Sequence, residues 1–167
     1  MRAFYLYVCL AAFAFAMCST CAARAANSVS TTRPDEIMKK VVIAESIQVA
    51  VPSSIEVIEE SPVEDFVLVK FFEGKTLILS AYVGNAPAFP GPDCDSRIDA
   101  GRSGTLPSRT AIGKEGTKCL KEVLVDLGST WPKFIHFAVS RGTDREIRYA
   151  ESIIASVQNV STQDADG

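Results

Sequence analysis

The chain has 167 residues, 47% of them hydrophobic, and a formal net charge of −3 at pH 7. Acidic and basic residues are interspersed without a basic stripe, so the composition argues against nucleic acid as a partner. Beyond the N-terminal segment no run approaches the roughly 18 apolar residues of a membrane span. The length suits a single domain with one core.

Residues 1–25 have the pattern of a secretory signal peptide. Arg2 precedes an apolar run, residues 3–17, and a patch of small residues follows. We expect cleavage after the Ala23-x-Ala25 pattern, which places the mature protein in the periplasm or outside the cell. Lipidation of Cys18 is the alternative, but the bulky Met17 before it argues against a lipid anchor.

The next segments predict a lead-in, a helix and two strands. Residues 26–36 are small and polar, which predicts a flexible lead-in. In residues 34–40 proline and acidic residues precede lysines, which favours a short helix aligned with its own dipole. Apolar residues then alternate over residues 47–51, and less regularly over residues 55–59, as in strands.

The strongest strand patterns are the apolar runs at residues 65–72 and 76–83. They lie on either side of Glu73-Gly74-Lys75 and predict an antiparallel hairpin. Residues 85–117 follow with four prolines, five glycines and no periodicity. We expect a long irregular loop there, and such loops are often functional.

Order resumes with strands predicted at residues 118–127 and 132–140. Thr143 and Glu146 then match a capping box, and apolar residues follow at helical spacing to Val157. The tail, residues 159–167, is polar and predicted to be disordered. The whole pattern predicts an α+β domain over residues 37–158. It would consist of an antiparallel β-sheet of about six strands, with a short N-terminal helix and a longer C-terminal helix packed on it.

Cys94 and Cys119 are the two cysteines beyond the predicted signal peptide. In an exported protein such a pair predicts a disulfide, here across most of the long loop. Two separate buried thiols are the alternative. Asp93, Asp95 and Asp99 resemble part of a calcium loop, but Gly104 stands where a bidentate glutamate is needed. We therefore expect no metal site and no cofactor.

Recognition is expected in the long loop. Phe89 would supply an apolar anchor, and the charged contacts would come from Arg97, Arg102 and Arg109. No catalytic residue is assigned, because the only histidine, His136, lies in a predicted strand without an identifiable nucleophile.

Several segments resemble small exported bacterial proteins of unassigned function with a PsbP-like α/β/α sandwich. The likeness rests on the runs Gln48-Val-Ala-Val-Pro52, Leu79-Ser-Ala-Tyr-Val-Gly-Asn-Ala-Pro87, Trp131-Pro-Lys-Phe-Ile-His-Phe-Ala and Tyr149-Ala-Glu-Ser-Ile-Ile-Ala-Ser156. It implies an antiparallel sheet with helices at both ends of the chain, and a non-catalytic role. Some periplasmic immunity proteins against cell-wall toxins share this general appearance.

We therefore expect an exported, non-catalytic binding or envelope-support protein that acts through contact with an unknown protein partner in the cell envelope. One alternative is a periplasmic immunity protein or inhibitor of a secreted toxin enzyme. The other is a small envelope hydrolase that uses His136.

Overall fold

The computed structural model describes residues 36–63 and 65–160. The predicted signal peptide, Cys18, most of the lead-in and residues 161–167 of the predicted tail lie outside these ranges. Within them, no helix is both long enough and apolar enough to cross a membrane.

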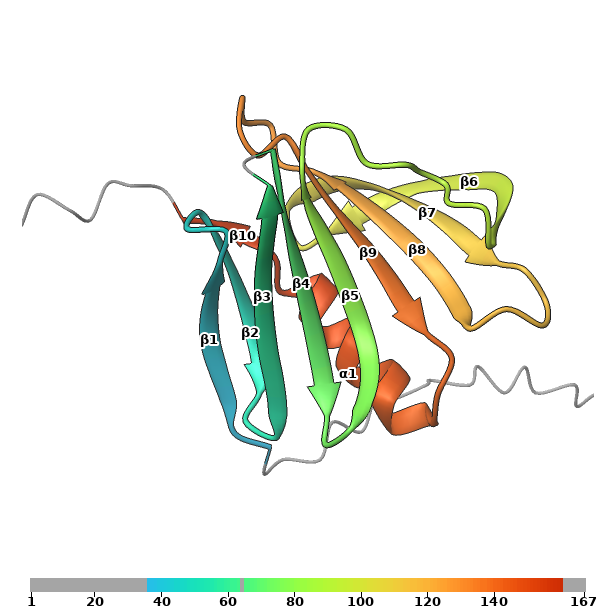
Figure 1. Cartoon of the computed structure of the whole chain (residues 1–167), viewed down its shortest axis with the longest axis horizontal. Coiled ribbons are helices and arrows are strands. Elements are labelled where there is room, and N and C mark those ends of the chain that lie inside the picture. Colours follow the sequence, from blue (N-terminus) through green and yellow to red (C-terminus); the bar gives the residue numbers. More distant parts are fainter. Residues whose placement is uncertain (1–35, 64, 161–167) are drawn as a thin grey trace, which may run out of the picture. The chain divides into compact units, whose positions relative to one another are not determined.

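Ten strands and one helix form in the described ranges (Figure 1). The first five strands are β1 (Met38–Ile43), β2 (Ile47–Pro52), β3 (Ile55–Val63), β4 (Phe66–Glu73) and β5 (Thr76–Gly84). The others are β6 (Cys94–Ser103), β7 (Leu106–Gly113), β8 (Cys119–Asp126), β9 (Phe134–Ser140) and β10 (Gln158–Asn159), with the helix α1 (Asp144–Ala155) after β9.

The predicted α+β class is wrong, because the structure is mostly β. The strands form a three-stranded sheet, β1-β2-β10, and a seven-stranded sheet, β3-β4-β5-β9-β8-β7-β6. Every pair of neighbouring strands is antiparallel. These two sheets and one 12-residue helix replace the predicted sheet of about six strands and its two helices.

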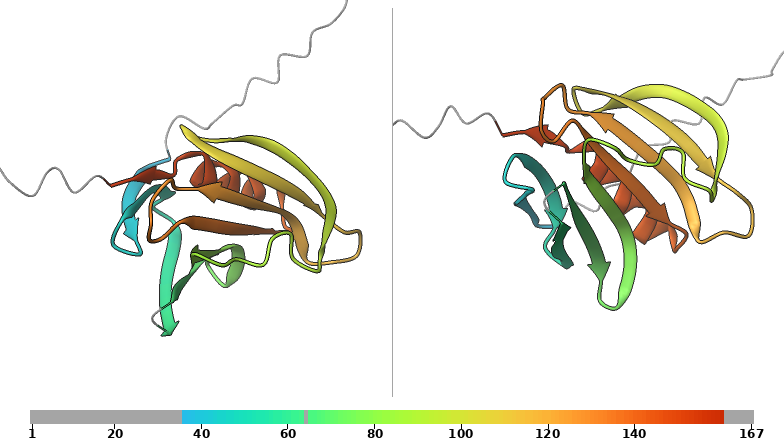
Figure 2. Two further views of the ribbon diagram at one scale, coloured as in Figure 1. Left: turned by 90° about the horizontal axis from the view of Figure 1, so that it is seen from above. Right: turned by 45° about the horizontal axis from the view of Figure 1, so that its top comes forward.

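The core lies where α1 packs against strands of both sheets. α1 contacts β2 of the small sheet and β5 and β9 of the large one. Figure 2 shows the helix on the inner side of the curved large sheet. The alternation predicted for β2 is confirmed, since Ile47, Val49 and Val51 are fully buried while the residues between them are not. The β4–β5 hairpin also has the predicted turn.

The capping box predicted for the C-terminal helix is confirmed. The Thr143 side chain accepts a hydrogen bond from the Glu146 backbone N–H, and the Glu146 side chain accepts one from the Thr143 backbone N–H. These contacts satisfy two donors that a helix start otherwise leaves unpaired. Hydrogen bonds from the backbone N–H and the hydroxyl of Thr143 to the Glu146 carboxylate lower its pKa.

The N-terminal helix predicted from residue 34 is wrong over its described part. β1 begins at Met38 and pairs with β2, from Met38 opposite Pro52 to Ile43 opposite Ile47. A helix there would leave the backbone groups along this edge of β2 without the partners that β1 provides. Helix propensity is a weak preference that such pairing overrides.

The long loop predicted at residues 85–117 is largely a hairpin. β6 and β7 pair across a turn in which Gly104 has a positive φ of 56°. Eight of the ten residues of β6 are exposed, because this strand is an edge of the sheet and has solvent on both faces. Such a strand has no apolar side to produce alternation, so hydrophobic periodicity could not reveal it.

β10 extends the regular structure to Asn159, one residue past the predicted end of the domain at residue 158. It pairs with β2, and the Val160 backbone N–H donates to the Ser46 carbonyl at 2.8 Å.

Candidate functional site

Glu122 and His136 lie on the face of the large sheet opposite the helix. Side chains alternate along a strand, so Val123 and Val125 point into the core and Glu122 points away from it. Glu122 is nonetheless 6% exposed. Residues 85–93, which connect β5 to β6, cross this face and cover it (Figures 1 and 2).

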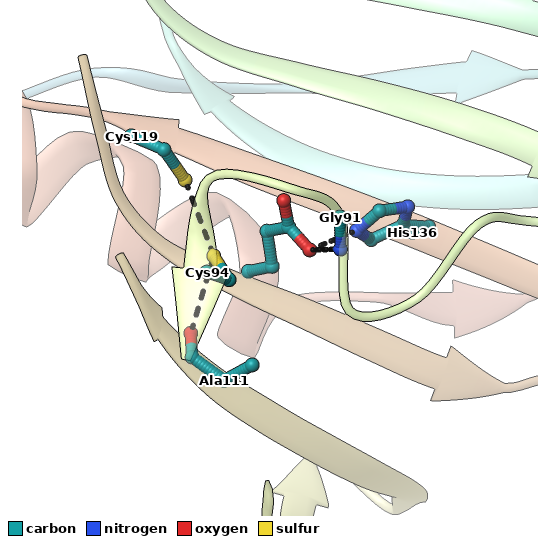
Figure 3. Close-up of polar contacts among 6 residues, drawn as sticks. Gly91, Cys94, Ala111, Cys119 and His136 are labelled. Carbon is teal, nitrogen blue, oxygen red and sulfur yellow. Dashed lines mark hydrogen bonds and ion pairs between the residues drawn. The ribbon is translucent and has the colours of Figure 1, made fainter. Parts of the chain in front are cut away.

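The Glu122 carboxylate fixes this connection to the sheet. Its Oε2 accepts the Gly91 backbone N–H at 2.7 Å and lies 3.1 Å from His136 Nε2 (Figure 3). Burial lowers the pKa of His136, while the Glu122 charge acts in the opposite direction. A carboxylate oxygen accepts hydrogen bonds, so His136 donates to Glu122 through Nε2–H.

Phe89 closes the site over the histidine. Its ring packs edge-on against the His136 imidazole with centroids 5.4 Å apart. The Arg109 guanidinium lies over the Phe89 ring, 5.6 Å from the ring centroid. Only 13% of the His136 side chain is exposed.

Cys94 and Cys119 meet beside Glu122 as free thiols. Their Sγ atoms are 3.7 Å apart, well beyond the roughly 2.05 Å of a disulfide (Figure 3). The disulfide therefore stays a prediction. The structure shows that the two cysteine sulfurs are neighbours. Burial raises the pKa of Cys94 to about 12 and also raises that of Cys119.

Two glycines allow the backbone to approach this cluster closely. A Cβ at Gly113 would stand 2.1 Å from the Cys119 carbonyl oxygen, and one at Gly91 would stand 2.7 Å from Glu122 Oε1. Arg141 holds the intervening β7–β8 loop, because its guanidinium donates to the carbonyls of residues 113, 114 and 117. Gly113 thus lies directly against the Cys119 backbone, and Gly91 lies directly against the Glu122 carboxylate.

A second feature lies at the C-terminal end of β5, where Tyr82 pairs across the strands with His136. A hollow of about 460 Å³ is lined by Asp65, Tyr82, Asn85, Ala86 and Trp131. Trp131, the only tryptophan of the chain, is 47% exposed. Tyr82 is held in place by stacking on Phe66, with ring centroids 5.1 Å apart.

Asn85 organises the loop that carries Trp131. Its Oδ1 accepts the Lys133 backbone N–H at 2.9 Å, and its Nδ2 donates to the Thr130 carbonyl at 3.4 Å. The two bonds bracket Trp131, so the exposed indole stands on a segment fixed on both sides.

The predicted binding residues do not gather into one free surface. Phe89 is half-buried against His136, with Arg109 over its ring. Arg97 is exposed and pairs with Asp99 at 3.6 Å, while Arg102 donates to the Thr105 carbonyl in the hairpin turn. Each of these side chains has a partner within the chain.

The sequence analysis missed Glu122 and Asn85. Glu122 alternates with the core residues Val123 and Val125, which is the usual pattern of a solvent-exposed glutamate, although the buried Leu124 lies on the same face as Glu122. Glu122 is buried only because the connection of residues 85–93 covers it, and the sequence around Glu122 gives no indication of this burial. Asn85 is the first residue of the expected loop, and its partners are 45 and 48 residues away.

No protein-family model, no curated protein and no solved structure matches this chain.

Proposed function

We propose that the protein is an exported, non-catalytic binding protein that acts through contact with another protein, and that the hollow beside Trp131 is its contact surface. The observation that supports this proposal is the exposed Trp131 indole, which lines the hollow together with a second aromatic ring, that of Tyr82. Tryptophan and tyrosine are the residues that most often dominate the energy of protein interfaces.

The fixed geometry of the rim favours binding. An interface loses affinity when side chains and loops must be ordered on association. Here the Asn85 hydrogen bonds already order the backbone on both sides of Trp131, and Phe66 already orders Tyr82. Little further ordering is therefore needed when a partner docks.

The chemistry of the hollow suits a basic side chain of the partner. Tyr82 and Trp131 offer ring faces that attract a cation, and the exposed Asp65 offers a carboxylate beside them. The protein itself carries net negative charge, which favours encounter with a basic surface. A lysine or arginine of the partner would then enter between the rings and the carboxylate.

The identity of the partner separates two versions of this proposal. An envelope protein would make the chain a binding or support protein, and a secreted enzyme would make it an immunity protein or inhibitor. The hydrolase alternative has less support, because Phe89 and the covering connection leave little of His136 open to a substrate.

Affinity capture from an envelope extract tests the proposal. The tagged wild-type protein should retain a specific partner, and Trp131→Ala and Asp65→Asn should each reduce its recovery at least tenfold. Ile112→Ala provides the matched control, because Ile112 is 51% exposed and does not line the hollow. Equal recovery by wild type and Trp131→Ala would contradict the proposed contact surface.

A further inference from the structure

Three donor groups of the kind that bind transition metals converge beside the β7–β8 loop. Cys94 Sγ, Cys119 Sγ and a carboxylate oxygen of Glu122 all lie within 4.8 Å of one another. We propose that these three side chains bind a zinc ion. The proposal is independent of the proposed function, because the hollow beside Trp131 shares no residue with this cluster.

The spacing of the sulfurs fits zinc. Two thiolates at a Zn–S distance of about 2.3 Å and a tetrahedral angle are separated by about 3.8 Å. The two Sγ atoms are 3.7 Å apart, so both could bind one ion without moving together or apart. A disulfide between the same atoms would require them to approach by more than an ångström. The observed separation is therefore one at which a single ion could bind both sulfurs.

The glutamate is held in place by hydrogen bonds. Ligating carboxylates are commonly fixed by further hydrogen bonds in this way. In Glu122 both hydrogen bonds, from Gly91 and His136, go to Oε2. These two contacts fix the carboxylate beside the two sulfurs.

The donor set also selects the kind of cation. Two thiolates and one carboxylate suit zinc or a similar thiophilic divalent ion, whereas magnesium prefers six oxygen ligands. Binding displaces one proton from each thiol, and the resulting thiolates and carboxylate offset the two positive charges of the ion. Three protein ligands leave the fourth tetrahedral position to water.

Metal binding to the exported chain tests the proposal. Protein isolated without reductant should contain one zinc per chain and two thiols that react with alkylating agents only after the zinc is removed. Cobalt in place of zinc should give the absorption bands of a tetrahedral site with thiolate ligands. Magnesium should neither bind nor displace zinc.

Variants assign the ligands. Cys94→Ser and Glu122→Gln should each weaken zinc binding at least tenfold, measured by competition with a chromophoric chelator. His136→Gln should weaken it by about 10- to 100-fold, the usual effect of losing a hydrogen bond to a ligand. Glu115→Gln, which alters an exposed glutamate in the adjacent loop, should bind zinc like wild type.

Three results would overturn the proposal. The first is an exported protein that carries a Cys94–Cys119 disulfide and no zinc. The second is a reduced, folded wild-type chain that binds no zinc, or whose cobalt form lacks thiolate bands. The third is wild-type affinity in a folded Glu122→Gln variant, which would remove the glutamate from the site. The cobalt spectrum of the wild type decides the matter even if a cysteine variant fails to fold.

Discussion

Replacing Glu122 by alanine tests how the connection between β5 and β6 is held on the sheet. The substitution removes the acceptor of two hydrogen bonds, one from the Gly91 backbone and one from His136 Nε2. Hydrogen bonds to a charged group contribute roughly 1.5–3 kcal/mol each. The two together correspond to about 3–6 kcal/mol.

The lower end of this range is expected. Removing the carboxylate also removes the cost of burying its charge. Water can reach Gly91 and His136, which are only half-buried, and replace part of what they lose. We therefore predict that Glu122→Ala lowers the free energy of unfolding by about 3 kcal/mol. Glu122→Gln keeps a neutral acceptor and should lose about half as much.

Urea denaturation of the metal-free protein measures both variants, so that any bound ion does not contribute. Hydrogen exchange gives a local readout, in which the Gly91 amide should exchange faster in Glu122→Ala. Two results together would refute the reasoning. The first is a loss below about 0.5 kcal/mol in the free energy of unfolding, which is the ordinary effect of a surface substitution. The second is unchanged hydrogen exchange at the Gly91 amide.

Three further predictions concern the fold. Gly113→Ala should lower the free energy of unfolding by about 2–3 kcal/mol, because its Cβ would overlap the rigid Cys119 carbonyl; an unchanged urea midpoint would contradict this. Ile153→Ala should cost about 2–5 kcal/mol in the same assay, since this fully buried side chain of α1 leaves a cavity. The Glu146 carboxylate, whose pKa is lowered, should stabilise the fold above its ordinary pKa of 4.5 and lose this effect as pH falls. Glu146→Gln retains the capping pattern, so the stability difference between it and the wild type should shrink toward about pH 3, where an ordinary glutamate is almost fully protonated. A stability difference that does not change with pH would contradict this prediction.

The sequence allowed prediction of the elements whose local pattern and tertiary role agree. β2 alternates because one side faces α1, and the β4–β5 hairpin has two apolar runs around a glycine turn. α1 has both its capping box and its apolar stripe. In each case the residues that form the element are also those that bury it.

The missed elements are those stabilised mainly by their neighbours. β6 is exposed on both faces and is held by its backbone pairing with β7, so its side chains carry no signal. β1 has a charge pattern that favours a helix, but pairing with β2 determines its conformation. The predicted fold class was wrong for this reason, because β1 formed where a helix was predicted, and β6 and β7 formed where a loop was predicted.

The candidate sites show the same division. The proximity of Cys94 and Cys119 could be anticipated from their isolation in the chain, and the structure places their sulfurs 3.7 Å apart, while the disulfide itself stays a prediction. Glu122 could not be anticipated, because its burial depends on a connection that begins 37 residues earlier, at Asn85. The hollow beside Trp131 likewise combines residues from three separate segments of the chain, around residues 65, 82–86 and 131.

Photo-crosslinking in cells that export the protein tests the proposed contact surface most directly. A photoreactive amino acid in place of Ala86, which is exposed and lines the hollow, should crosslink to one partner protein. The crosslink should disappear when Trp131→Ala or Asp65→Asn is added, and the same probe at Ile112 should not produce it. No crosslink from position 86, or an equal one from position 112, would contradict the account.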